Sequence, residues 1–131
     1  MLTVEYSDDP SLLEKLYEKT GINAEVGGIN AVLYENENAV GVCRMTLTDG
    51  IVDVGDFAVA HGTAEKAFAE DFFFRTILFK LSFTPVLVRI DGEDDRLKKF
   101  GFAKENGKSV LKASEAVFPS LCEGNKRKNG I

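Results

Sequence analysis

The sequence predicts an α/β domain of the α+β kind, with a mixed, mostly antiparallel twisted sheet flanked by about three helices. Three observations support this class. Asp49-Gly50 and Asn106-Gly107 each separate two extended runs and are strong signals for tight hairpin turns. The run "VLVRI" has the unbroken apolar character of a buried central strand. The segment "AEKAFAEDFFFRTILFKLS" has the length and apolar spacing of a long helix.

Length and composition limit the classes of protein to which the chain can belong. Its 131 residues suffice for one domain with its own core, which we expect at residues 1–122, followed by a disordered polar tail at 123–131. A net charge of −5 argues against nucleic acid as the main partner. Two cysteines and one histidine are too few for a structural zinc site. No segment has the apolar length of a membrane span or a signal peptide, so we expect a cytoplasmic protein.

The first half of the chain predicts a strand, a helix and three further strands. The strand is "MLTVEYS", and the helix "DDPSLLEKLYEKTG" has Asp8 or Asp9 as its cap and Gly21 as its stop. The next three strands form "NAVLYENENAVGVCRMTLTDGIVDVGDFAVA", with turns near 36–38 and at 49–50. Cys43 lies in this apolar pattern, which favours a buried reduced thiol, with a disulfide to Cys122 as the alternative.

The second half predicts the long helix, one strand, a shorter helix and a closing hairpin. The long helix is expected from Ala64 to Ser82, and Pro85 opens the following strand. The short helix "GEDDRLKKFGF" has acids early and lysines late, which suits the helix dipole, and ends at Gly101. The order of elements is therefore β-α-β-β-β-α-β-α-β-β.

The long helix has apolar residues on two sides. The first side contains Ala67, Phe74, Ile77, Leu78 and Leu81, and a second stripe contains Phe68, Phe72, Phe79 and Phe83. The second stripe packs either against the other helices or against a second copy in a homodimer. Between the stripes, Asp71 and Arg75 have the i to i+4 spacing of a helical ion pair.

This layout resembles the GNAT superfamily of N-acetyltransferases, which transfer an acetyl group from acetyl-CoA to an amine. The likeness covers about residues 30–112 and is carried by three features: the strand series ending in "DVGDFAVA", the strand-loop-helix "FAVAHGTAEKAFAEDFFFRTILFKL" and the segment "RLKKFGFAKENGKSVLKAS". Family members usually have two helices near the N-terminus, where this chain has one clear helix.

The resemblance implies a cofactor loop between the fourth strand and the long helix. The family motif there is Gln or Arg, two residues, Gly, one residue, then Gly or Ala. It falls on Ala64, Glu65, Lys66, Ala67, Phe68 and Ala69, of which only Ala69 fits. Their amides would face the pyrophosphate of acetyl-CoA, and the strand edge of Phe57, Ala58 and Val59 would pair with the pantetheine arm. The alternative is a scaffold helix capped by Thr63, with Ala64 at its first position.

The resemblance also directs attention to the fourth strand for catalysis. The family often has a tyrosine as the acid on its last helix, where this chain has Leu97, and the nearest match to a family asparagine is Asp91. Gly55 is a predicted bulge, which the family uses to separate two strands. Strict alternation expects two faces: Ile51, Asp53, Gly55, Phe57 and Val59 on one, and Val52, Val54, Asp56, Ala58 and Ala60 on the other.

Two residues are candidate bases for the amine. Asp56 lies beside the predicted bulge and would act through water, and its alternative role is a solvated carboxylate. His61, the only histidine, ends the strand and either serves as base, binds a phosphate or bonds a neighbouring carbonyl. The resemblance thus implies an N-acetyltransferase acting on a small-molecule or peptide amine. The alternative is a non-catalytic binding module with the same fold.

Overall fold

The computed structural model describes residues 1–92 and 94–118. Seven strands within these ranges form one sheet. The strand order in the sheet is β1-β2-β3-β4-β5-β7-β6. The strands are β1 (Leu2–Ser7), β2 (Ile29–Glu35), β3 (Asn38–Thr48), β4 (Ile51–Val59), β5 (Leu87–Asp91), β6 (Ala103–Glu105) and β7 (Lys108–Lys112). Only β4 and β5 pair in parallel. The predicted mixed, mostly antiparallel sheet is confirmed.

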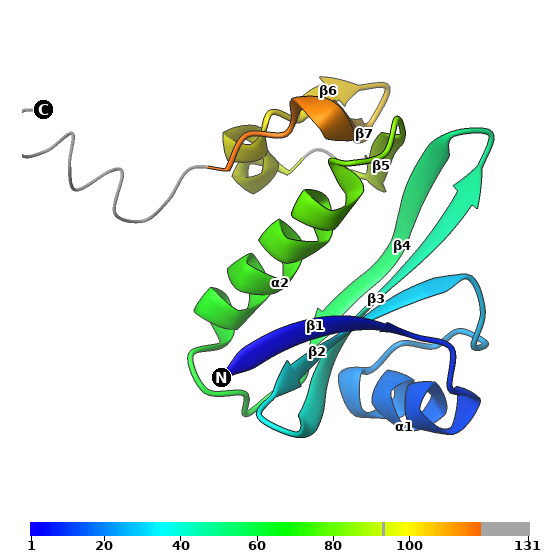
Figure 1. Ribbon diagram of the computed structural model, residues 1–131, viewed down its shortest axis with the longest axis vertical. Helices are drawn as coiled ribbons and strands as arrows, with labels where there is room; N and C mark the ends of the chain where they lie inside the picture. The colour runs from blue at the N-terminus through cyan, green and yellow to red at the C-terminus, as the bar shows by residue number, and fades with distance from the viewer. Residues whose placement is uncertain (93, 119–131) are drawn as a thin grey trace, which may run out of the picture.

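Helices cover both faces of this sheet. The helix α1 (Pro10–Thr20) packs on one face and α2 (Lys66–Leu81) on the other (Figure 1). The segments η1 (Asp95–Phe100) and η2 (Ala113–Glu115) are 3₁₀ helices, so the predicted short helix exists with a tighter winding. The predicted tail falls outside the described residues. No helix in the described ranges is long and apolar enough to cross a membrane.

Local sequence chemistry fixes the turns and the ends of α1. At the predicted hairpins, Asp49-Gly50 has φ angles of +51° and +76°, and Asn106-Gly107 has +52° and +78°. These left-handed pairs are what a tight primed turn requires. The Asp9 carboxylate accepts hydrogen bonds from two amides of the first turn of α1, and left-handed Gly21 ends the helix. Asp9, rather than Asp8, is therefore the cap.

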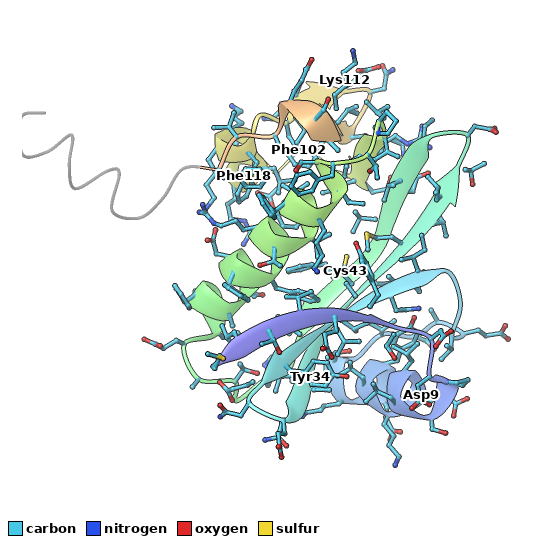
Figure 2. The ribbon with its side chains drawn as sticks, in the orientation of Figure 1. Asp9, Tyr34, Cys43, Phe102, Lys112 and Phe118 are labelled. Carbon is cyan, nitrogen blue, oxygen red and sulfur yellow. The ribbon has the colours of Figure 1, made fainter. Side chains whose placement is uncertain are left out.

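The larger core lies between α2 and the sheet. It is made of side chains from β1 to β4 and from α2: Val4, Ala31, Leu33, Val40, Cys43, Met45, Val52, Val59, Ala69, Phe73 and Ile77. Cys43 lies between α2 and the sheet (Figure 2) and is free, which confirms the buried thiol among the described residues. Burial raises the pKa of this thiol to about 12, so it stays protonated at neutral pH.

The two apolar sides of α2 are real, and the first was predicted in large part, since Phe74, Ile77, Leu78 and Leu81 pack in the cores. Ala67 was wrongly included in that prediction, and Ala69 and Phe73 were missed. The buried residues are Ala69, Phe73, Ile77 and Leu78, whereas Ala67 is exposed. Phe73 faces the sheet, and Phe74 contacts the rings of Phe100 and Phe102 at centroid distances of 5.4 and 6.0 Å. Because α2 is covered on two sides, its helical period alone did not identify which residues face the sheet.

The predicted phenylalanine stripe is divided by the fold. Phe72 packs against the core under α2, while Phe68, Phe79 and Phe83 are 49%, 53% and 74% exposed. The Phe79 ring meets Phe83 and Phe118 in edge contacts, at the end of α2 where Phe118 lies (Figure 2). The homodimer through these residues stays a prediction.

A polar pair is buried under α1. Tyr17 and Asn30 are each 3% exposed, and the Tyr17 hydroxyl donates a hydrogen bond to Oδ1 of Asn30. The Asn30 amide nitrogen donates to the Gly27 carbonyl at 3.0 Å. Burial raises the pKa of Tyr17, so its phenol is neutral under physiological conditions. The dyad therefore fixes α1, the loop before β2 and the start of β2 to one another.

We expect Tyr17→Phe to lower the free energy of unfolding by about 1–3 kcal/mol, because it leaves the buried Asn30 oxygen without a donor. Urea denaturation followed by circular dichroism measures this loss. Tyr34→Phe is the matched control, since no described residue hydrogen-bonds the Tyr34 hydroxyl, and we expect a change within about 0.5 kcal/mol. Equal effects of the two substitutions would contradict a stabilising role for the dyad.

Candidate active site

Strand β4 contains a bulge that ends its pairing with β5. Arg44 of β3 pairs with Asp56 and Met45 pairs with Val54, so Gly55 is the extra residue of the bulge, as predicted. The parallel pairing between β4 and β5 runs from Ile51 to Val54 and stops there. From Gly55 to Val59, β4 therefore has an unpaired edge on the side of β5.

The bulge also corrects the predicted faces of β4. Val52 and Val59 belong to the core under α2, and Val54 and Phe57 pack against it. Phe57 contacts the rings of Phe73 and Phe74 at 5.1 and 5.7 Å. Strict alternation was wrong because the extra residue at Gly55 shifts the side-chain pattern by one position. Asp53 and Asp56 consequently lie on the same face of the sheet, the one that carries α1.

The start of α2 also differs from the sequence expectation. The helix begins at Lys66 rather than Ala64, and the Thr63 hydroxyl donates to the Ala60 carbonyl instead of capping the helix. Glu65 occupies the cap position with a φ of +47° and makes no side-chain capping bond. A left-handed conformation is strained for any residue with a Cβ, at about 1–2 kcal/mol.

This helix start has backbone amides available for an anion. The first helical amides, those of Lys66, Ala67 and Phe68, have no acceptor earlier in the helix, whereas the next amide is bonded to the Glu65 carbonyl. A left-handed residue followed by helical residues is the alternation that builds concave anion sites from amides. The exposed Glu65 carboxylate opposes a bound anion, and Lys66 is the cation in the first turn.

The unpaired edge and the helix start together fit the parts of acetyl-CoA. The pantetheine arm contains amide groups that can pair with a strand edge, and Gly55 to Val59 supplies such an edge. The pyrophosphate is an anion of the kind that helix amides bind, and α2 begins seven residues after β4 ends. The predicted cofactor-binding segments are thus consecutive along the chain, and the group fits them.

The structure pairs the first candidate base with a cation. Asp56 lies next to the bulge, and the Arg44 Nη2 and Nε atoms lie 2.7 and 2.8 Å from its Oδ2. Sequence reasoning missed Arg44, and only the register between β3 and β4 identifies it. It missed the Tyr17–Asn30 dyad as well, although Asn30 is the cross-strand neighbour of Arg44.

The structure does not bring His61 to this carboxylate. His61 is exposed in the turn beyond the end of β4, whereas Asp56 lies three residues inside the strand, which is about 10 Å along it. No described residue forms a hydrogen bond with its ring. The predicted bond of His61 to a neighbouring carbonyl is therefore not made among the described residues.

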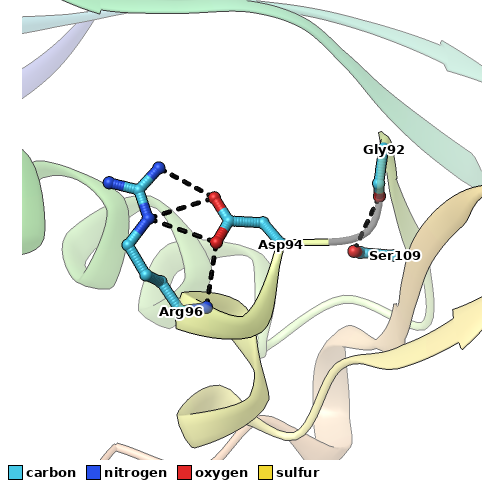
Figure 3. A network of polar contacts seen from close by, with 4 residues as sticks. All are labelled: Gly92, Asp94, Arg96 and Ser109. Carbon is cyan, nitrogen blue, oxygen red and sulfur yellow. Dashed lines mark hydrogen bonds and ion pairs between the residues drawn. The ribbon is translucent and has the colours of Figure 1, made fainter.

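Gly92 and Asp94, which follow β5, each form polar contacts. The Asp94 carboxylate accepts hydrogen bonds from the Arg96 backbone amide at 2.9 Å and from the Arg96 guanidinium, as Figure 3 shows. These bonds from Arg96 lower the pKa of Asp94. The Ser109 hydroxyl donates to the Gly92 carbonyl at 2.9 Å and ties Gly92 to β7. The end of β5 is thereby fixed at the point where β4 turns away from it.

The two positions suggested by the family pattern in this region have other roles. Asp91 is highly exposed and forms an ion pair with Lys108 of β7. Leu97 packs against the smaller core of Leu78, Val88, Phe100, Phe102, Leu111 and Ala113. The predicted ion pair of Asp71 with Arg75 is confirmed at 3.2 Å, and Lys99 joins it at 2.6 Å.

Comparison with known proteins identifies this arrangement. No family model matches the sequence, and no curated protein matches it significantly. Among solved structures, a GNAT acetyltransferase from Brucella melitensis in complex with acetyl-CoA is similar at a TM-score of 0.64 and 12% identity, over 86% of this chain and 88% of that one. The chain has the GNAT fold.

Two further GNAT structures are from Escherichia coli. The ribosomal-protein-S18-alanine N-acetyltransferase is similar at a TM-score of 0.63 and 10% identity, over 84% of this chain and 89% of that chain. The GNAT protein YhbS, in complex with CoA, is similar at 0.61 and 13% identity, over 86% and 81%. Identities this low establish a shared fold. They do not extend to the side chains of the candidate site.

Proposed function

We propose that this protein is an acetyl-CoA-dependent N-acetyltransferase. The observation that carries the proposal is the unpaired edge of β4, Gly55–Val59, which leads directly to the open amides at the start of α2. Similar GNAT structures with acetyl-CoA or CoA bound support the same cofactor here. The motif on residues 64–69 is degenerate, and backbone groups rather than glycines supply the contacts.

Acetyl-CoA supplies an acetyl thioester, which acylates amines. In our proposal the β4 edge from Phe57 to Val59 aligns the pantetheine arm, and the amides of Lys66 to Phe68 bind the pyrophosphate. Asp56 accepts a proton from the acceptor amine, directly or through water, at the Oδ1 atom that Arg44 leaves open. Leu97 supplies no acid, so the leaving thiolate takes its proton from water.

The second candidate is a non-catalytic binding module with the GNAT fold. Two observations favour it. The negative charge of Glu65 at the start of α2 weakens the binding of an anion there, and the ion pair with Arg44 makes Asp56 a weaker base. The two candidates differ in a measurable way, because only the first requires tight binding of acetyl-CoA.

Differential scanning fluorimetry with acetyl-CoA tests the proposal. A ligand at a hundredfold excess over its Kd stabilises the native state by about 2.7 kcal/mol, so we expect a rise in melting temperature of several degrees. Adenosine is the control, because it lacks the pyrophosphate and the pantetheine arm. An unchanged melting temperature at millimolar acetyl-CoA would leave the non-catalytic module as the function.

We expect Glu65→Gly to strengthen acetyl-CoA binding about two- to fivefold, because it removes a negative charge beside the bound diphosphate. It also relieves the positive φ, and after the entropic cost of glycine we expect a net gain of about 0.5 kcal/mol in unfolding free energy. Isothermal titration calorimetry and urea denaturation measure the two effects. Glu65→Gln removes the charge but keeps the strain, so it should reproduce only the gain in affinity.

A further inference from the structure

Two arginine–aspartate pairs on the same face of the sheet have different geometries. In the Arg89–Asp53 pair, Nε lies 2.7 Å from Oδ1 and Nη2 lies 2.9 Å from Oδ2, so both carboxylate oxygens are used. In the Arg44–Asp56 pair, Nε and Nη2 contact the same oxygen, Oδ2, at 2.8 and 2.7 Å. The first is a closed fork-to-fork pair, whereas the second leaves one atom of each partner unused.

The unused atoms are Oδ1 of Asp56 and Nη1 of Arg44. Within residues 1–92 and 94–118, no hydrogen bond reaches either atom. The two side chains remain 31% and 27% exposed, so a ligand can reach them from solvent. One ion pair thus offers both a hydrogen-bond acceptor with negative charge and a donor with positive charge.

The surroundings hold this pair in place at the end of the β4–β5 pairing. A Cβ at Gly55 would lie 3.1 Å from Arg44 Nη2, so the glycine leaves room for the guanidinium over the bulge. Across the strand, the buried Tyr17–Asn30 dyad borders Arg44 through the Asn30–Arg44 register. The hydrophobic residues that pack with α1 on this face include Val32 and Val42, and the Arg44 and Asp56 side chains beside them stay partly exposed.

We propose that the Arg44–Asp56 pair binds the zwitterionic group of an α-amino acid, with the ligand carboxylate on Arg44 Nη1 and the ligand ammonium on Asp56 Oδ1. Because Arg44 and Asp56 are themselves in contact, the free Nη1 and Oδ1 atoms belong to one ion pair. A compact zwitterion, in which one carbon separates the carboxylate from the ammonium, presents both opposite charges to one ion pair. An amine without a neighbouring carboxylate leaves Arg44 unmatched.

The role of this site as the acceptor site rests on the proposed acetyltransferase function. The ligand nitrogen would then lie at the bulge, beside the edge assigned to pantetheine. In the transfer, a bond forms between this nitrogen and the acetyl carbon, and the C–S bond of the thioester breaks. The ammonium group loses one proton to solvent before attack and a second through Asp56 Oδ1, which passes it to solvent. The thiolate sulfur takes one proton from water, so one proton is released overall. The product would be an N-acetylamino acid.

A titration of the uniformly ¹⁵N-labelled protein with glycine, followed by NMR without acetyl-CoA, tests the site. We expect glycine to shift the Gly55 and Asp56 amide resonances and the Arg44 Nε resonance. Glycinamide, which keeps the amine but lacks the carboxylate, should bind at least about tenfold more weakly. Asp56→Asn should abolish binding. Arg44→Gln, and Arg44→Lys with its charge but a single nitrogen, should remove the preference for glycine. Arg89→Gln, in the closed pair, should leave it unchanged.

Equal affinity for glycine and glycinamide would overturn the inference, because the carboxylate would then not be recognised. The absence of any shift with glycine at high millimolar concentration would overturn it as well. Fluorimetry with acetyl-CoA on the same samples separates the two proposals. Glycine binding without acetyl-CoA binding would retain the amino-acid site and reject the transferase. Acetyl-CoA binding without glycine binding would reject the amino-acid site alone.

Discussion

Phe73→Ala is expected to lower the free energy of unfolding by about 3–5 kcal/mol. The Phe73 side chain is fully buried between α2 and the sheet, and its ring lies 5.1 Å from that of Phe57. Truncation removes the buried ring and leaves a cavity that the surrounding strands cannot fill completely. Such a loss is a large fraction of the 5–15 kcal/mol that typically stabilises a domain. Urea denaturation gives the value directly.

Phe68→Ala is the matched control for this prediction, because Phe68 is on the same helix and 49% exposed. We expect it to cost about 0.5 kcal/mol or less. If the two alanine variants lost similar amounts of stability, Phe73 would not occupy the centre of the core.

Gly28→Ala is expected to cost about 2–4 kcal/mol of unfolding free energy. Gly28 precedes β2 with a φ of +71°, and a Cβ there would lie 2.5 Å from the Met45 carbonyl oxygen. The substitution therefore adds a collision with backbone to the strain of a left-handed residue. The start of β2 would have to move, and with it the buried Asn30. Thermal and urea denaturation measure the loss.

Gly21→Ala separates the two causes, since Gly21 has a φ of +80° and nothing within 4 Å of its virtual Cβ. It should lose only the conformational term, about 1–2 kcal/mol. Equal losses at both positions would mean that the chain around Gly28 relaxes and that the close contact with Met45 has no energetic weight.

Much of the fold could be predicted because its signals are local. The Asp49-Gly50 and Asn106-Gly107 turns, the Asp9 cap and the Gly55 bulge each depend on the chemistry of one or two residues. The effect of the bulge on the side-chain faces of β4 is not local, and it was not predicted. The extra residue moves every side chain after Gly55 to the face opposite to the one that strict alternation predicts. The predicted faces assumed strict alternation along the whole strand.

The candidate site was predictable in part. Asp56 was identified from its place beside Gly55, but Arg44 becomes its partner only through the pairing of β3 with β4. At the start of α2, Thr63 has the chemistry of a cap, whereas the chain places Glu65 there with a positive φ. This conformation is uncommon for a residue with a side chain, so propensity argues against it.

The pairing between β4 and β5 spans only Ile51 to Val54 on β4. The sheet therefore has two parts, β1 to β4 and β5 to β7, that are joined only by this short pairing. The helix α2 packs against both parts. Ile77 of this helix belongs to the core with β1 to β4, and Leu78 belongs to the core with β5 and β7. The angle between these two parts of the sheet is therefore set by how α2 packs on both of them.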